Sequence, residues 1–439
     1  MREPQHILVL VENLSVPFDR RVWHECTTLV AAGYDVSVIC PQGQRHDREA
    51  YEGRDGVCIY RYPLASQATG LWGYPREYSS MLWHTASLAR RLWTKRPFDV
   101  IHACNPPDLF FLIGRMYRPR GVSFVFDQHD ASPEIMIAKR GGGEHEGFPE
   151  RVVRWAERST YRLADIVISP NESYRRLALT RGGKAEEDVF VVRSGPRRAE
   201  FSPETEGTFD RRGHRHLVAY LGVMGAQDGV DLLVRAVARL VREGRDILLY
   251  LAGDGESYAT IRHLGEELGL GERLLMPGYQ TAEEFAPALL AADVCVTPDP
   301  SSPFNDISTM NKIVEYMAMG RASVAFALPE NVATGGDAVA YADDLSHEGL
   351  AAAIGRLLDG EEERRRMGAL ARERFESVLA WEHQAPGLLA AYERLRAKVG
   401  GRNARAARGP GDAPGACAPG GGRGAGGPGS SGSAAPEES

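Results

Sequence analysis

Short apolar stretches rich in β-branched residues alternate with longer amphipathic stretches in the first half of the chain. Buried strands are predicted at residues 6–12, 35–40, 99–103 and 123–127, and an amphipathic helix at 19–32. The pattern continues with strands at 165–170 and 189–193, separated by a helical stretch over 171–182. Such alternation predicts βαβ units and a mostly parallel sheet.

The same alternation starts again after a polar interruption. Residues 194–216 are rich in Pro, Gly and charge and lack periodicity, which indicates a linker. Further strands are predicted at 216–222, 246–253, 273–278, 293–298 and 322–326, with helices between them. The predicted fold class is therefore α/β, with two Rossmann-like domains whose parallel sheets face each other across a cleft, because ligands of open α/β sheets bind beyond the carboxyl ends of the strands.

These patterns divide the chain into four parts. The first domain is predicted at residues 1–195, the second at 213–376, and a last helix at 377–398. From 399 to 439 the chain consists largely of Gly, Ala, Pro, Ser and Arg, with almost no large apolar side chain. A disordered tail is expected there because such a segment cannot bury enough surface to order itself.

Composition sets limits on function and location. The 439 residues are 43% hydrophobic and 25% charged, as expected of a globular protein with two domains, and the net charge of −7 disfavours a nucleic-acid-binding protein. The six cysteines are scattered singly without a CxxC pair, which favours a reducing, cytoplasmic compartment. No apolar stretch approaches the roughly 20 residues that span a bilayer, so any membrane contact is expected to be peripheral, at the inner face of the cell membrane.

Glycine and short polar residues follow four predicted strands of the second domain. These residues are Gly222, Gly225 and Gly229 after the first strand, Gly253, Asp254 and Gly255 after the second, Gly278 and Tyr279 after the third, and TPDP at 297–300 after the fourth. One such turn is explained equally well by tight packing of a helix on a strand. Four of them at one sheet edge favour a nucleotide site, because the carboxyl ends of parallel strands converge.

A cluster of Asn, Asp, Ser and Thr precedes a helix that is predicted to begin near Ser308. The unpaired N–H groups of a first helical turn, together with the macrodipole, bind anions. Backbone N–H groups that would face phosphates are expected at Ser308, Thr309, Met310 and Asn311. The alternative is an ordinary N-cap by Asp306 or Ser308.

The order of these motifs resembles glycosyltransferase family 4, the retaining enzymes with the GT-B fold. The second-domain motifs are GVMGAQDG, LAGDGE, MPGY, ADVCVTP and VEYMAMGRASVAF, and DRRVWHECTTLVAAGYDVSVICP and FVFDQHDASPE resemble that family's acceptor domain. The resemblance covers residues 5–393. It implies transfer of a sugar from a nucleoside diphosphate sugar, uridine-linked, to a polysaccharide or lipid-linked glycan, with retention and without a metal or other cofactor.

The resemblance also implies roles for single residues. Glu315 matches the glutamate that holds the donor's ribose, and His129 matches the histidine that contacts the transferred sugar and assists the reaction. The family's partner glutamate lies eight residues before Glu315, where this chain has Ile307. The neighbouring Asp306 either takes over a sugar hydroxyl or only caps the helix.

Two cations of the family's Gly-rich turn are replaced by Val223 and Asp228. Another cation is expected because a leaving diphosphate needs stabilisation. Lys312 is the candidate and Arg193 the reserve, and the alternative for Lys312 is a solvated helix residue. If Lys312 serves the diphosphate, the substitution Lys312→Met depresses donor affinity and turnover together.

The loop after the first strand lacks the family's Gly pair, so Ser15 and either Arg20 or Arg21 are expected to contact phosphate in its place. The alternatives for such an arginine are capping of the helix end and an ion pair with Glu25. His102 is expected to be structural.

Other functions and surfaces stay open. A degenerate protein that binds a nucleotide or a partner transferase without turnover fits the missing carboxylate and cations, whereas an epimerase would need paired acidic residues that the sequence does not show. Basic and aromatic residues gather in two stretches, one with Trp72, Trp83, Trp93, Arg90, Arg91, Lys95 and Arg96 and one with Arg151, Arg154 and Arg158. Each stretch is either a membrane-interface helix or a core-facing stripe with a solvated basic face.

Overall fold

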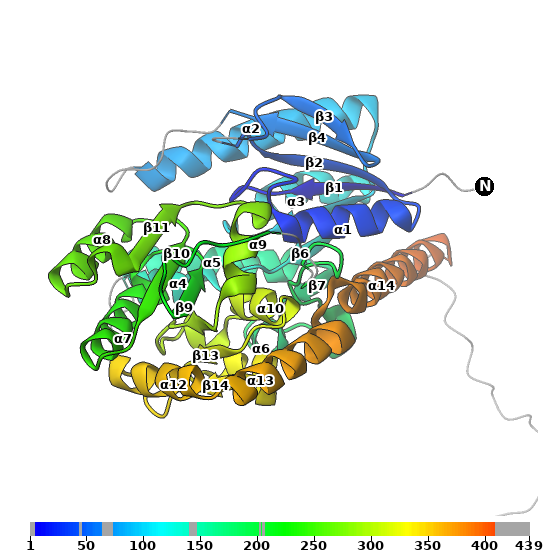
Figure 1. Cartoon of the computed structure of the whole chain (residues 1–439). Coiled ribbons are helices and arrows are strands. Elements are labelled where there is room, and N and C mark those ends of the chain that lie inside the picture. The colour runs from blue at the N-terminus through cyan, green and yellow to red at the C-terminus, as the bar shows by residue number, and fades with distance from the viewer. Residues whose placement is uncertain are drawn as a thin grey trace, which may run out of the picture. The chain divides into compact units, whose positions relative to one another are not determined.

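The structure is a computed structural model that describes residues 5–43, 46–63, 73–139, 147–201, 203 and 207–408. Residues 1–396 form one compact unit that contains both sheets (Figure 1). The predicted fold class, two Rossmann-like domains with mostly parallel sheets, is confirmed. No described helix combines the length and the apolar character needed to cross a bilayer.

The N-terminal sheet has eight strands in the order β3-β4-β2-β1-β5-β6-β7-β8. They are β1 (His6–Leu10), β2 (Asp35–Pro41), β3 (Tyr51–Arg54), β4 (Val57–Tyr62), β5 (Val100–Cys104), β6 (Ser123–Asp127), β7 (Ile166–Ser169) and β8 (Val189–Val191). All neighbours are parallel except the β3–β4 hairpin at the edge. Periodicity missed this hairpin because β3 is largely exposed and has no apolar run.

The C-terminal sheet has six parallel strands in the order β11-β10-β9-β12-β13-β14. They are β9 (His216–Leu221), β10 (Ile247–Ala252), β11 (Leu274–Gly278), β12 (Val294–Thr297), β13 (Ser323–Ala325) and β14 (Val339–Tyr341). The strand order reverses between β9 and β12, as it does between β1 and β5 in the first sheet. Ligands bind at such switch points, so the loops after these four strands are where a site is expected.

Fourteen helices connect and cover the strands among the described residues. In the first domain they are α1 (Arg20–Ala31), α2 (Gly73–Lys95), α3 (Phe111–Tyr117), α4 (Ser132–Lys139), α5 (Phe148–Leu163) and α6 (Glu172–Thr180). The later helices are α7 (Val230–Arg242), α8 (Tyr258–Glu267), α9 (Ala282–Ala291), α10 (Asn311–Ala318), α11 (Pro329–Gly335), α12 (His347–Asp359), α13 (Glu361–Arg374) and α14 (Trp381–Arg408). Short turns are η1 (Arg118–Arg120), η2 (Glu186–Asp188), η3 (Ala226–Asp228), η4 (Gly271–Arg273), η5 (Asn305–Ile307) and η6 (Gly336–Ala338), and Phe375–Leu379 forms the π-helix η7.

Apolar side chains cover both faces of the first sheet. On one face, Ile7 and Val9 of β1 pack with α1 and with Leu388 and Tyr392 of α14, which runs beside α1 in Figure 1. On the other face, Leu8 and Leu10 pack under α2, α3 and α5. α14 extends to Arg408, beyond the predicted helix end at 398, and the rest of the predicted tail, 409–439, lies outside the described residues.

Candidate functional site

The Gly-rich loops of the C-terminal sheet touch one another at the carboxyl ends of its strands, as predicted. Gly253 has φ 145°, and a Cβ there would lie 1.8 Å from the carbonyl oxygen of Gly222, so no larger residue fits. The Gly253 N–H also donates to the Gly278 carbonyl at 2.9 Å. Asn305, in the loop after β12, donates to the Gln227 carbonyl at 2.9 Å. Four loops therefore form one continuous backbone surface at the switch point.

The turn between Gly225 and Gly229 is held by Asp228. Its carboxylate accepts from the Gly225 N–H at 2.8 Å. Asp228 therefore organises the turn at a position where the family has a cation, and Val223, at the other such position, is 62% exposed. Neither residue supplies positive charge, so compensation must come from elsewhere in the site.

Helix α10 begins at Asn311, later than the predicted start near Ser308. Its N-cap is Met310, without a side-chain cap, so capping of this helix by Asp306 or Ser308 is wrong. The Ser308 N–H is already used, because it donates to the Asn305 carbonyl at 3.3 Å. The N–H of Asn311, in the first turn of α10, has no intrahelical partner by the geometry of a helix.

Asp306 lies on η5, one turn before α10. One carboxylate oxygen accepts from Ser301 Oγ at 3.0 Å. The other, Oδ1, is buried and has no hydrogen-bond partner among the described residues. A buried acceptor without a donor is costly, so this oxygen suits a hydroxyl from a ligand.

The first domain clamps the loop that leads into α10. Asn171, at the start of α6, donates to the Ile307 carbonyl at 2.8 Å and to Thr309 Oγ1 at 3.0 Å. The Tyr174 hydroxyl lies 3.1 Å from Ser308 Oγ. The side chains of Ser308 and Thr309 thus join the domains. Asn171 and Tyr174 were missed, although NESY directly follows a predicted strand and stood at the right sheet edge.

Lys312 lies inside the protein with its ammonium group in an ion pair. Its Nζ donates at 2.9 Å to both carboxylate oxygens of Asp299 and lies 5.0 Å from the centre of the Tyr220 ring. Burial disfavours the charged form, but the attraction of Asp299 outweighs it and raises the pKa of Lys312 above its usual value. The solvated alternative is therefore wrong. The pairing of Asp299 with Lys312 was missed because the TPDP turn gives no sign of burial.

This pair predicts a stability effect of Lys312→Met besides any kinetic one. The substitution strands the Asp299 carboxylate in the interior and is expected to cost about 3 kcal/mol. Urea unfolding monitored by circular dichroism measures it. The double variant Lys312→Met/Asp299→Asn removes the stranded charge and should recover part of the loss. An unchanged urea midpoint for Lys312→Met would contradict the buried pair.

Arg20 and Glu315 connect the two domains across the site. Arg20, the first residue of α1, forms an ion pair with Glu315 of α10, and this carboxylate raises the pKa of Arg20. The Glu315 side chain is 6% exposed, whereas that of Arg20 is 47% exposed. Arg20 is thus the accessible partner of a carboxylate that points into the site.

Arg21 is structural, so its predicted phosphate contact is wrong. It is buried, donates to Asp127 Oδ1 and to the Val192 carbonyl, each at 2.7 Å, and lies 3.2 Å from Glu25. The alternative of a pair with Glu25 is confirmed. Arg193, the reserve cation, donates at 3.4 Å to Thr334 Oγ1.

Loops of both domains line a cavity of about 270 Å³. Its lining residues are Asn13, Leu14, Ser15, Phe18, Pro41, Gln42, Gly43, His46, Asp254 and Tyr279. The cavity thus brings Ser15 of the first domain together with Asp254 and Tyr279 of the second. However, Ser15 is buried and donates to Asp47 at 2.8 Å, so its hydroxyl is engaged within the first domain.

His129 follows β6 at the carboxyl edge of the first sheet. Its N–H donates to Asn105 Oδ1 at 2.7 Å, and Nε2 lies 2.5 Å from Asp127 Oδ2. Its side chain is 16% exposed. Burial lowers the pKa of His129, but the Asp127 carboxylate raises it more, so the pKa lies above its usual value. The geometry fits an imidazole held rigidly with one edge accessible.

A buried ionic cluster lies beneath His129. His102 Nδ1 lies 2.8 Å from the Tyr392 hydroxyl, and Nε2 lies 3.3 Å from Glu25 and 3.5 Å from Asp127. Burial lowers the pKa of His102, but the neighbouring carboxylates of Asp127 and Glu25 raise it to about 9. Its position within these contacts fits the predicted structural role.

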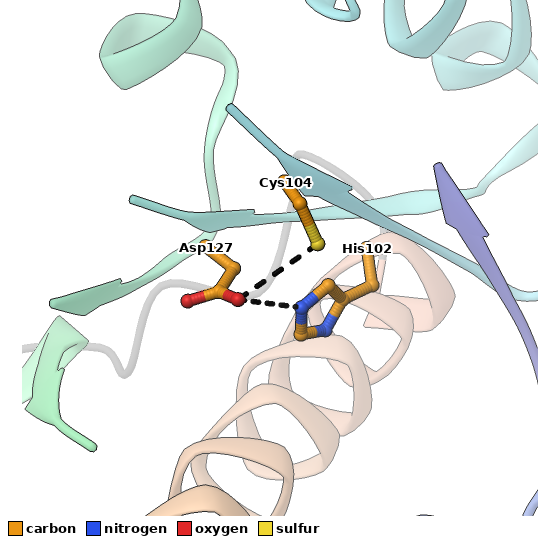
Figure 2. Close-up of side chains that lie close together, drawn as sticks. All are labelled: His102, Cys104 and Asp127. Atoms are coloured by element: carbon orange, nitrogen blue, oxygen red, sulfur yellow. Dashed lines mark hydrogen bonds and ion pairs between the residues drawn. The ribbon is translucent and has the colours of Figure 1, made fainter. Parts of the chain in front are cut away.

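His102, Cys104 and Asp127 also lie within reach of a single ion (Figure 2). A second such group is Glu25, Asp127 and His129. Asp127 belongs to both groups, and its oxygens already accept from Arg21 and His129. The cluster thus balances its carboxylates with a guanidinium and imidazoles, a donor set that suits internal ion pairs better than a metal ion.

Comparison with known families gives two matches. A glycosyl transferase 4-like domain matches residues 19–195, and a glycosyl transferases group 1 domain matches residues 215–360. The boundary between them falls within the linker predicted at 194–216.

Two glycosyltransferases are similar to part of the chain. The chain is 33% identical over 224 residues to the MMP α-(1→4)-mannosyltransferase of Mycolicibacterium hassiacum, which covers 50% of this chain and 52% of that protein. It is 28% identical to the D-inositol 3-phosphate glycosyltransferase of Mycolicibacterium smegmatis, with 74% of each chain covered. The chain thus spans about half the length of the mannosyltransferase.

Solved structures share the fold. Sucrose-phosphate synthase from Thermosynechococcus elongatus superposes with a TM-score of 0.73 at 20% identity, over 90% of this chain and all of that one. HepE of Anabaena in complex with UDP and glucose gives a TM-score of 0.62 at 14% identity, over 90% of this chain and 99% of that one.

Proposed function

The chain belongs to glycosyltransferase family 4, with the GT-B fold, and on that premise we propose that it is a retaining hexosyltransferase that takes its sugar from a uridine diphosphate donor. The observation that carries the proposal is that four strand-end loops meet at the switch point of the C-terminal sheet, where Glu315 of α10 pairs with Arg20 of the first domain. HepE in complex with UDP and glucose, which shares this fold, supports a uridine-linked donor.

The donor's phosphates would lie against the Gly-rich turn and the first turn of α10. Backbone N–H groups of these two segments would donate to the phosphate oxygens. Because Gly222 and Gly253 have no side chains, the phosphates could approach the backbone closely. Glu315 would accept the ribose hydroxyls. The unpartnered Oδ1 of Asp306 would accept a sugar hydroxyl, which supports Asp306 as the substitute for the missing glutamate.

Arg20 takes the cationic role that Arg21 cannot. The ribose hydroxyls and Arg20 compete for the same Glu315 carboxylate, so donor binding would release the guanidinium. The half-exposed Arg20 could then turn to the diphosphate. Lys312 lies below the Gly-rich turn, because a Cβ on Gly222 would lie 3.1 Å from its Cε, but Asp299 already balances its charge there. Arg20 would therefore stabilise the leaving diphosphate without a metal.

The acceptor hydroxyl would attack on the face from which the diphosphate departs, so the anomeric configuration is retained. His129 would contact the transferred sugar, held by Asp127 and by its own N–H to Asn105. The acceptor would be a polysaccharide or lipid-linked glycan at the cytoplasmic face of the membrane. A degenerate binder without turnover is the second candidate, because Val223 and Asp228 replace the usual cations.

A panel of nucleoside diphosphate sugars tests the proposal. A bound donor stabilises the folded state by about 2.7 kcal/mol at a hundredfold excess over Kd, so one donor should raise the melting temperature clearly. Release of nucleoside diphosphate by the wild type then measures turnover. Stabilisation by a uridine donor with turnover is the expected result. Stabilisation without turnover, with acceptors supplied, favours the degenerate protein, and no stabilisation by any donor contradicts both.

A further inference from the structure

Helices α3 and α5 carry large apolar side chains on their solvent-facing sides. These are Leu112 (39% exposed) and Met116 (51%) on α3 and Phe148 (79%), Val152 (42%) and Trp155 (52%) on α5. The spacings of four within α3 and of four and seven within α5 place each set on one helical face. The helices are neighbours, because the Phe111 and Trp155 rings lie 5.5 Å apart.

These side chains are not part of the core. α5 already buries its opposite face through Ala156, Thr160 and Tyr161, and Ile113 does the same for α3. Both helices therefore have two apolar faces, one against the sheet and one outward. We call the outward set, Leu112, Met116, Phe148, Val152 and Trp155, the α3–α5 surface.

Among the described residues of α3 and α5, the exposed charged side chains are all of one sign. The two glutamates of α5, Glu150 and Glu157, are buried, at 4% and 1% exposure. The exposed charged residues of α5 are the arginines Arg151, Arg158 and Arg162, and α3 adds an exposed Arg115. In α5 the glutamates face the interior, and the exposed arginines lie beside exposed aromatic side chains. Helices that lie at a membrane interface have this distribution of charged and apolar residues.

We propose that the α3–α5 surface docks the first domain onto an anionic lipid bilayer. Apolar side chains would enter the acyl boundary while the arginines meet lipid phosphates. A protein partner, including a second copy, would need acidic groups opposite every flanking arginine, whereas an anionic membrane supplies them everywhere. The other aromatic stretch, at α2, does not form such a surface as a whole. Trp93 packs on Phe98 and Tyr117, whereas Trp83 is 68% exposed. Trp72 lies outside the described residues.

Vesicle co-sedimentation of the full chain tests the docking independently of any transferase activity. The wild type is expected to pellet with phosphatidylcholine vesicles containing phosphatidylglycerol and to remain in solution with phosphatidylcholine alone. Phe148→Ser/Val152→Ser should lower partitioning at least about tenfold, since each removes apolar contact with the acyl boundary. The melting temperature should not change, because both side chains are exposed.

Charge variants supply the matched comparison. Arg151→Gln/Arg158→Gln should weaken binding about tenfold or more and reduce its salt dependence. Arg235→Gln/Arg239→Gln, on exposed positions of α7, removes the same charge elsewhere and should leave binding nearly unchanged. The proposal is overturned if the two double substitutions weaken vesicle binding equally. It is also overturned if the wild type does not bind vesicles that contain phosphatidylglycerol. A dimer in solution that Phe148→Ser/Val152→Ser dissociates would reassign the surface to self-association.

Discussion

Glu315→Gln is expected to lower turnover by at least about 100-fold and to remove the donor-dependent rise in melting temperature. A hydrogen bond to a charged group contributes about 1.5–3 kcal/mol, so two ribose hydroxyls on one carboxylate account for this loss. Glutamine keeps the shape but not the charge. Initial rates of nucleoside diphosphate release at several donor concentrations, with thermal shifts on the same samples, measure both effects.

Substituting the two residues of the Arg20–Glu315 pair one at a time separates their roles. Without Glu315, Arg20 loses its partner, but its side chain is 47% exposed and can be solvated, so the stability without donor should change little. Arg20→Gln alone should weaken turnover more than donor affinity, because it removes a competitor for Glu315 as well as a cation for the leaving group. Wild-type turnover by Glu315→Gln would falsify the ribose role and leave Glu315 as a domain-bridging residue only.

The parts of the site that could be predicted from sequence are those that strand order dictates. Gly222, Gly253 and Gly278 follow buried strands, and parallel pairing brings such positions together whatever the loops do in detail. The same rule placed His129 at the carboxyl edge of the first sheet. Asp306 lies one turn before α10, and its buried Oδ1 has no hydrogen-bond partner among the described residues.

What could not be predicted are the pairings between distant segments. Arg20 and Arg21 are adjacent and identical in type, yet one lies in the site and the other is buried on Asp127, 106 residues away. Helical phase separates them, since neighbouring residues on a helix point about 100° apart. Lys312 and Asp299 likewise form their pair only because the loop after β12 folds back onto α10, which no local pattern encodes.

The buried cluster around Asp127 carries the largest expected stability effect. Asp127 is fully buried, and Arg21, His102 and His129 all approach its two oxygens. Burial opposes its ionisation, but the Arg21 guanidinium and the two histidines hold its pKa well below the usual range. Its contribution to stability is therefore present above about pH 4 and is lost as the pH falls through that lowered pKa.

His102 gives the cluster an opposite pH dependence on the alkaline side. Its pKa is raised to about 9, so its stabilising charge is fully present below the unfolded value of about 6.5 and is lost as the pH rises through 9. The loss over that interval is on the order of 3 kcal/mol. The free energy of unfolding of the wild type is thus expected to fall between pH 6.5 and 9.

Asp127→Asn should cost about 5 kcal/mol at pH 7, the upper end for a broken buried pair, because the Arg21 guanidinium and two imidazoles lose one carboxylate together. It should also flatten the fall between pH 6.5 and 9, since His102 then loses an anion that keeps it protonated. Urea unfolding from pH 5 to pH 9 measures both. Asp359→Asn, which breaks an exposed pair with Arg245, is the matched control and should change little. A wild-type urea midpoint for Asp127→Asn, or an unaltered pH profile, would show that Glu25 alone balances the cluster.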